Sequence, residues 1–332
     1  MKMSTLIMME AGLAGALALS AVGCDQQEAY EDDNAFFGPN LEPRPGTISG
    51  GGGWGCQSCD YTNSPHCGAH GIGRVATGAD ASPPDIKIAH IEDPSGNMYG
   101  VEVVDDEFFA QTPAGLVHGG ALVGWTLVFS NGLIEFTTEV TAFEYHGDWV
   151  TQDLIPTYGL AYEDITQPEP ELVNVCPGFI PDETSVVLIA DELYDETTRT
   201  VIPGQPGWTT LACQGHALAK MKFAGYDPND QYGSVPENRQ ATLKMFTADY
   251  CGGGQPFTIV GKKLQWVDAL AHFTEQMLPY LGAVEARWTD AGAECLDEPR
   301  HVARSEVEAV CDIPTCDGDP DIGGADWVTL LP

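Results

Sequence analysis

Three cysteines and a histidine form the clearest metal-binding pattern in the sequence. The pattern reads Cys56-x2-Cys59-x7-Cys67-x2-His70. Three thiolates and one imidazole suit a small tetrahedral zinc site. In an oxidising compartment these three cysteines would instead form two disulfides together with one cysteine elsewhere, or one disulfide that leaves a free thiol. Both interpretations stay open, and the evidence for export given below favours disulfides.

A second pattern suggests calcium. The segment 317–321 alternates aspartates in the way that an EF-hand loop begins. That loop needs glycine at its sixth position and glutamate at its twelfth, where this chain has Ile322 and Val328. An EF-hand is therefore excluded. A looser calcium site that also uses Asp326 is the alternative to a solvated acidic tail. We expect no cofactor, with zinc or calcium as the alternatives.

Catalytic motifs are missing from the sequence. It contains no Gly-x-Ser-x-Gly, Ser-x-x-Lys, His-Glu-x-x-His or phosphate-binding glycine loop. Cys213 and His216 are three residues apart and could form a nucleophile and its base, but a disulfide is the simpler use of Cys213. His118 precedes two glycines and is interpreted as a loop residue rather than a base. The catalytic residues stay unknown, and the sequence favours a protein that is not an enzyme.

The overall charge limits the partners. The chain has 49 acidic and 14 basic residues, a formal net charge of −35. Phosphate contacts need lysine and arginine, so this balance argues against binding to nucleic acid or to an anionic membrane surface. We interpret the charge as a solubilising surface outside the cell, and loading with divalent cations is the alternative.

The first 23 residues are typical of an export signal. Lys2 is followed by a mostly apolar stretch that is too short to span a bilayer. Residues 21–24 (Ala-Val-Gly-Cys) resemble the lipobox of bacterial lipoproteins, in which the cysteine becomes the lipidated first residue. The sequence therefore predicts a signal peptide over 1–23 and a lipid anchor on Cys24. The alternative is an ordinary secretory signal in which Cys24 is an incidental thiol. We expect the protein in the cell envelope, on the periplasmic face or the cell surface.

The rest of the chain divides by composition. Residues 24–53 are acidic and then rich in proline and glycine, which predicts a disordered tether. A segment rich in cysteine and glycine covers 54–84, a β-rich region covers 85–170, and an acidic tail covers 301–332. Between them, 171–300 is assigned to a separate domain.

Turn signals predict hairpins in the β-rich region. Residues 85–91 and 98–104 flank the turn sequence Asp-Pro-Ser-Gly-Asn, and 121–129 and 133–140 flank Ser-Asn-Gly. Strand-forming residues continue over 137–145. The run Ser185–Ala190 predicts a buried strand.

Helices are predicted after Trp208. Thr210 could cap a helix over 211–224, with Gly225 just past its end. Pro236 could open a second helix that ends near Thr247, and 268–278 predicts a third. The expected fold is α+β, with a mostly antiparallel β part followed by a disulfide-braced helical part.

The segment Ala248-Asp249-Tyr250-Cys251, followed by three glycines, resembles the signature of the ADYC domain family. The surroundings agree, because Leu211-Ala212-Cys213 and residues 291–295 (Ala-Gly-Ala-Glu-Cys) resemble the flanks of that domain. The likeness spans about 172–300. The family is found mainly in exported and lipid-anchored bacterial proteins, and it brings no established activity.

Disulfides follow from this resemblance rather than from spacing. A helical hairpin that carries the signature would pair Cys213 with Cys251. We further expect the pairs Cys176–Cys295 and Cys311–Cys316. In this setting Asp249 and Tyr250 would cap a helix end and pack beside the cystine, and a catalytic role is the alternative.

Three functions stay open. The favoured one is a lipid-anchored envelope or cell-surface protein with an interaction or structural role and a protein or polysaccharide partner. The second is a hydrolase that acts on wall or extracellular polymer. The third is a metal-dependent or redox accessory protein.

Overall fold

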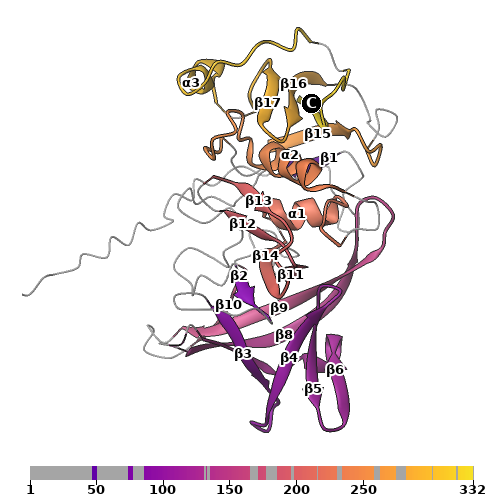
Figure 1. Ribbon diagram of the computed structural model, residues 1–332, viewed down its shortest axis with the longest axis vertical. Coiled ribbons are helices and arrows are strands. Elements are labelled where there is room, and N and C mark those ends of the chain that lie inside the picture. The colour runs from indigo at the N-terminus through magenta and orange to yellow at the C-terminus, as the bar shows by residue number, and fades with distance from the viewer. Residues whose placement is uncertain are drawn as a thin grey trace, which may run out of the picture. The chain divides into compact units, whose positions relative to one another are not determined.

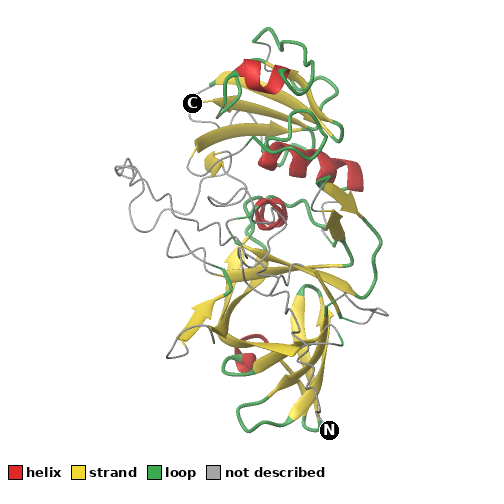
Figure 2. Ribbon diagram, turned by 90° about the vertical axis from the view of Figure 1, so that its left-hand side faces the viewer, coloured by secondary structure: helices red, strands yellow, loops and turns green. Residues whose placement is uncertain are grey.

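The computed structural model describes residues 47–50, 74–77 and 86–331, with gaps at 131, 133–134, 165–170, 177–184, 196–197, 215, 230–233, 258–261, 274–281, 301 and 319–320. These residues belong to one compact unit that starts at Phe37. The unit contains two main β-sheets, and the helices α1 (Ala217–Phe223) and α2 (Pro236–Thr247) lie between them (Figures 1 and 2).

The larger sheet has eleven strands. Its order is β2-β14-β11-β9-β8-β7-β3-β4-β5-β6, and β10 pairs with β9. All pairs are antiparallel except one parallel contact between β2 and β3 at Ala76 and Lys87. Because β2 pairs with both β14 and β3, seven strands form a closed ring of pairing. The strands are β2 (Arg74–Ala76), β3 (Lys87–Glu92), β4 (Met98–Val104), β5 (Glu107–Thr112), β6 (Gly115–His118), β7 (Thr126–Ser130), β8 (Glu135–Gly147), β9 (Leu154–Asp164), β10 (Glu171–Asn174), β11 (Ser185–Ala190) and β14 (Trp208–Cys213).

The second sheet is antiparallel and has the order β1-β15-β18-β16-β17. Its strands are β1 (Thr47–Gly50), β15 (Lys262–Asp268), β16 (Ala283–Thr289), β17 (Gly292–Leu296) and β18 (Trp327–Leu331). A separate ribbon joins β12 (Leu193–Asp195) to β13 (Thr200–Ile202). The helical elements are η1 (Gly119–Leu122), α1 (Ala217–Phe223), α2 (Pro236–Thr247) and α3 (Arg304–Glu308).

Two hydrophobic cores meet across strand β11. Side chains alternate between the faces of a strand, so Val186 and Leu188 pack into the core of the larger sheet. Val187 and Ile189 point the other way, into a core shared with α1, α2 and the second sheet. Both faces are covered, which explains why β11 reads as an uninterrupted apolar run.

Tryptophans dominate the second core. Trp266, Trp288 and Trp327 come from three neighbouring strands, and each is fully buried. Trp266 meets Phe246 of α2 edge to face, with ring centroids 5.7 Å apart. The second helix is therefore held by aromatic packing against the sheet.

The strand predictions of the β-rich region are confirmed. β3 and β4 pair as a hairpin through Ile91 and Tyr99, and β7 and β8 pair from Thr126 to Ser130. The first arm of the second hairpin is shorter than predicted, because residues 119–122 form η1 instead. The buried strand Ser185–Ala190 has the predicted bounds.

The predicted helical C-terminal part is wrong. From Trp208 onward, the described residues form β14 to β18 and three short helices, so this part is rich in strands. The helix predicted over 211–224 begins only at Ala217, because residues 208–213 form β14. Like β11, this strand is covered on both faces, so its apolar run lacks the alternation that separates strand from helix. Of the third predicted helix, 268–273 are the end of β15 and a turn, and 274–278 lie outside the described residues.

The second predicted helix is correct. It runs from Pro236 to Thr247, with proline in the first turn. The Asn238 side chain accepts a hydrogen bond from the amide of Val235 and so caps the start of the helix. None of the helices in the described part of the chain is long and apolar enough to cross a bilayer.

Candidate functional site

The signature segment 248–254 starts where α2 ends. Ala248 has the left-handed conformation, with φ of 51°, and its amide bonds back to the carbonyls of Lys244 and Met245. A residue in this conformation commonly ends a helix, and glycine is its usual occupant. Here a buried alanine fills the position, so the side chain is small enough for the tight packing that follows.

Asp249 forms a buried ion pair with the helix that precedes it. Its Oδ2 accepts from Lys244 Nζ at 2.8 Å and from the amide of Gly254, also at 2.8 Å. The Lys244 ammonium also donates to the carbonyls of Thr198 and Gly252. The carboxylate thus binds the amide of Gly254 directly and is linked to the carbonyls of Thr198 and Gly252 through Lys244. Asp249 is fully buried.

Tyr250 belongs to a second buried group. Its hydroxyl donates to Glu285 Oε1 at 2.5 Å, and Arg300 Nε donates to the same oxygen at 2.7 Å. The Arg300 guanidinium lies 5.7 Å from the centre of the Trp288 ring, which adds a cation–π contact. Burial, and then the charge of Glu285, raises the pKa of Tyr250 well above its ordinary value. The phenol therefore stays protonated and acts as a hydrogen-bond donor.

The glycines of the signature lie against the β16–β17 turn. Gly252 has φ of 68°, and a Cβ there would overlap the carbonyl oxygen of Ala291. The amide of Ala293 donates to the Tyr250 carbonyl at 2.9 Å. Gly253, by contrast, has open space where a Cβ would stand. Gly252, unlike Gly253, is therefore needed for this close backbone approach, and so is Gly292 on the opposite side of the contact.

Cys251 completes the segment with a disulfide to Cys311. The predicted pairing of Cys213 with Cys251 is wrong, because Cys213 bonds to Cys176. The reason is the fold: Cys213 ends a strand of the larger sheet and lies in its core, next to Cys176.

The other two expected pairs are wrong as well. Cys295 bonds to Cys316 rather than to Cys176, and Cys316 is therefore not bonded to Cys311. All six cysteines after residue 171 thus form disulfides, but each has a partner other than the expected one. Two of the bonds anchor the segment after 301 to the second sheet and to the signature.

Further buried ion pairs join α1 and α2 to the rest of the unit. Arg239 of α2 donates through Nε and Nη2 to Glu192, which is fully buried. Lys222 of α1 pairs with Asp106 at 2.6 Å and also with Asp227. Burial alone would lower the pKa of Lys222, but these two carboxylates raise it above its ordinary value. Asp106 follows β4, so this pair links the larger sheet to the helices.

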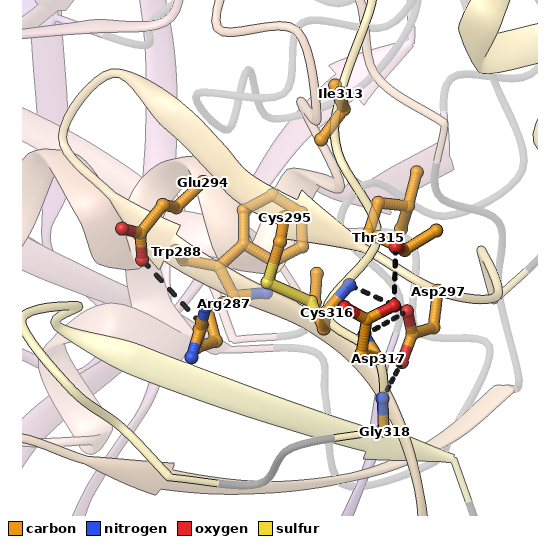
Figure 3. The surroundings of a disulfide bond; sticks show 12 residues. Arg287, Trp288, Glu294, Cys295, Asp297, Ile313, Thr315, Cys316, Asp317 and Gly318 are labelled. Atoms are coloured by element: carbon orange, nitrogen blue, oxygen red, sulfur yellow. Dashed lines mark hydrogen bonds and ion pairs between the residues drawn. A yellow bond between two sulfur atoms is a disulfide. The ribbon is translucent and has the colours of Figure 1, made fainter.

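The predicted calcium loop is organised by another carboxylate. Asp297 accepts the amides of Cys316 and Gly318 at 2.7 and 2.8 Å, beside the Cys295–Cys316 bond (Figure 3). Asp326 binds Asn238 instead. Among the described residues, no group of three histidine, cysteine, aspartate or glutamate side chains could hold a metal ion. Residue 319 lies outside them.

The structure brings together only part of the predicted site residues. Ala248, Asp249, Tyr250 and Cys251 lie together in the signature. The zinc candidates Cys56, Cys59, Cys67 and His70, and the lipidation candidate Cys24, lie outside the described residues. The Cys213–His216 pair is excluded as a nucleophile and base, because Cys213 is in a disulfide.

Sequence reasoning missed the partners of the signature. Lys244 could have been found, because it lies on the predicted helix five residues before Asp249. Glu285 and Arg300 gave no local signal, since their importance depends on strand β16 and the residues after β17 meeting Tyr250. The site is thus a buried set of charged and aromatic contacts, in which Asp249 Oδ1, Glu285 Oε2 and both Nη atoms of Arg300 make no hydrogen bond within the described part of the chain.

Comparison with known families gives one match. It is to the ADYC domain and covers residues 119–302, more than half of the chain. The match starts earlier than the predicted domain 171–300, and so includes η1 and strands β7 to β10. Neither the comparison with curated proteins nor that with solved structures gives a match. The signature, its flanks and this match together show that the chain belongs to the ADYC domain family.

Proposed function

We propose that this chain is an exported protein, held at the bacterial cell envelope by a lipid on Cys24, and that it works by binding or bracing rather than by catalysis. The apolar leader and the lipobox-like residues 21–24 support this localisation. The three disulfides support export, because such bonds form and persist in oxidising compartments.

The burial of the signature is the observation that carries the non-catalytic part of this proposal. Asp249 is 0% exposed and Tyr250 is 1% exposed. A catalytic side chain has to touch a substrate, and these two contact Lys244, Glu285 and the backbone instead. The residues that define the family therefore hold the fold together. Recognition of a partner belongs to another surface.

Metabolic labelling with a radioactive fatty acid tests the proposed lipid anchor on Cys24. The wild-type chain should carry label and fractionate with membranes, and Cys24→Ser should lose both. Cys316→Ser is the matched control, since it removes a cysteine of the body and should keep the label. Label that persists in Cys24→Ser, or a wild-type chain without label, would contradict the proposed anchor.

A further inference from the structure

One group of polar and aromatic side chains on the larger sheet is not used by the signature. Glu107 at the start of β5, His118 at the end of β6 and Tyr145 in β8 meet there. His118 Nδ1 and Glu107 Oε1 are 2.7 Å apart, and the Tyr145 hydroxyl lies 3.5 Å from Glu107 Oε2. We call these three residues the sheet-face triad.

The triad has a defined hydrogen-bonding pattern. An ionised carboxylate only accepts hydrogen bonds, so His118 Nδ1 must donate to Glu107. In the neutral imidazole this leaves Nε2 as an acceptor. The His118 side chain is 50% exposed and that of Glu107 only 12%. The triad thus presents an exposed imidazole that a largely covered carboxylate orients.

Neighbouring residues fix these positions. The His118 ring stacks on Phe109, with centroids 4.6 Å apart, and Tyr145 meets Phe143 edge to face at 4.9 Å. Gly119 has φ of 58°, and a Cβ there would lie 3.1 Å from Glu107 Oε1 and 3.3 Å from Phe143. The glycine after His118 is therefore needed for the carboxylate and the ring to approach the chain.

The half-exposed side chains of Tyr145 and His118 lie here beside a carboxylate that can accept hydrogen bonds from hydroxyls. Tyr145 is 49% exposed, and burial together with Glu107 raises the pKa of its phenol, which therefore remains a donor. Aromatic residues with a polar end suit ligands that are apolar on one side and polar on the other. Sugar rings have this character, because their C–H faces pack on aromatic rings while their hydroxyls donate to imidazole and carboxylate acceptors.

The charge of the chain restricts the kind of sugar. A net charge of −35 repels anionic polymers, and the triad itself contains a carboxylate. A metal ion is a poor alternative, since the described residues offer no third ligand near Glu107 and His118. We propose that the sheet-face triad and its aromatic neighbours bind an uncharged glycan chain. This partner class rests on the interaction role proposed above.

Affinity electrophoresis of the full chain tests the site directly. Native gels would contain laminarin, mannan or xyloglucan as uncharged probes and polygalacturonate as an anionic probe. At least one uncharged polymer should retard the wild-type chain. Tyr145→Ala and His118→Ala should each weaken that retardation about tenfold or more. Leu172→Ala, which removes an exposed side chain from β10, should bind as the wild type does.

Controls separate binding from folding and from other ligands. Circular dichroism and the melting temperature of Tyr145→Ala should match the wild type, because the side chain is half exposed. Each of three results would overturn the proposal: no retardation by any uncharged probe, retardation that both variants keep, or retardation by polygalacturonate alone. The fatty-acid labelling of Cys24 is independent of these gels, so a failure of glycan binding would not contradict the proposed lipid anchor.

Discussion

Replacing Asp249 with asparagine should destabilise the protein strongly, because it breaks a buried ion pair without changing the size of the side chain. Lys244 and Asp249 are 3% and 0% exposed, and their charged atoms lie 2.8 Å apart. Removing one partner of such a pair typically costs about 3–5 kcal/mol, since the other charge stays buried. We expect the lower end, about 3 kcal/mol, because Lys244 keeps two carbonyl acceptors.

This cost converts into a measurable shift. The entropy of unfolding is about 2 cal/mol/K per residue, so 1 kcal/mol lowers the melting temperature of a unit of about 300 residues by about 1.6 °C. Asp249→Asn should therefore melt about 5 °C below the wild type. Urea unfolding followed by tryptophan fluorescence gives the free energy, because Trp266, Trp288 and Trp327 are buried in the core beside α2.

A double-mutant cycle isolates the pair itself. Lys244→Met alone leaves Asp249 buried without its cation, whereas Lys244→Met with Asp249→Asn removes both charges. The double variant should be more stable than the sum of the single losses predicts, by about 2 kcal/mol. Glu308→Gln is the matched control, because it breaks an exposed pair with Arg304 at 2.7 Å and should cost less than about 1 kcal/mol.

Two results would refute this reasoning. One is a single variant Asp249→Asn within about 0.5 kcal/mol of the wild type, the size of an ordinary surface substitution. The other is a cycle in which the two single losses simply add, which would mean that the two side chains do not interact.

Three further predictions address other parts of the fold. Gly252→Ala should lower the free energy of unfolding in urea by more than about 3 kcal/mol, because φ is positive and the new methyl overlaps the Ala291 carbonyl. Gly253→Ala is the control and should change this free energy little, because a Cβ there meets open space. Equal losses of stability in the two variants would contradict the packing described. Mild reductant should open the partly exposed Cys251–Cys311 bond before the two buried disulfides. Alkylation of the freed thiols followed by mass spectrometry would show the order. Simultaneous opening of the three bonds would contradict the difference in burial. Burial lowers the pKa of His216 to about 4 from its ordinary 6.5. Its contribution to stability is therefore complete above pH 6.5, and about 3 kcal/mol is lost as the pH falls from 6.5 to 4. His216→Leu should show a correspondingly weaker loss of stability over that pH range, and an unchanged pH dependence would contradict this.

Sequence patterns located the strands and helices that carry local signals. The two hairpins of the β-rich region follow from turn residues between alternating segments. The helix Pro236–Thr247 follows from its proline start and from the glycines beyond it. In these cases the residues that decide the structure lie within a few positions of one another.

The errors arose where distant packing decides. Strand β14 and the start of the predicted helix 211–224 share the same apolar residues, and only the cover on both faces makes them a strand. The disulfides failed for the same reason, since Cys213 faces a different core from Cys251. The function of Tyr250 as a donor to Glu285 likewise depends on β16, 35 residues further along the chain.

Because the ADYC signature is buried, Tyr250 should resist nitration by tetranitromethane in the native protein, whereas a tyrosine in a reaction site would be accessible to the reagent. Mass spectrometry of tryptic peptides would compare Tyr250, which is 1% exposed, with Tyr145, which is 49% exposed. We predict that Tyr145 is nitrated and that Tyr250 is protected until the chain unfolds. Nitration of Tyr250 as fast as that of Tyr145, in protein that keeps its native circular dichroism, would contradict a structural role for the buried signature.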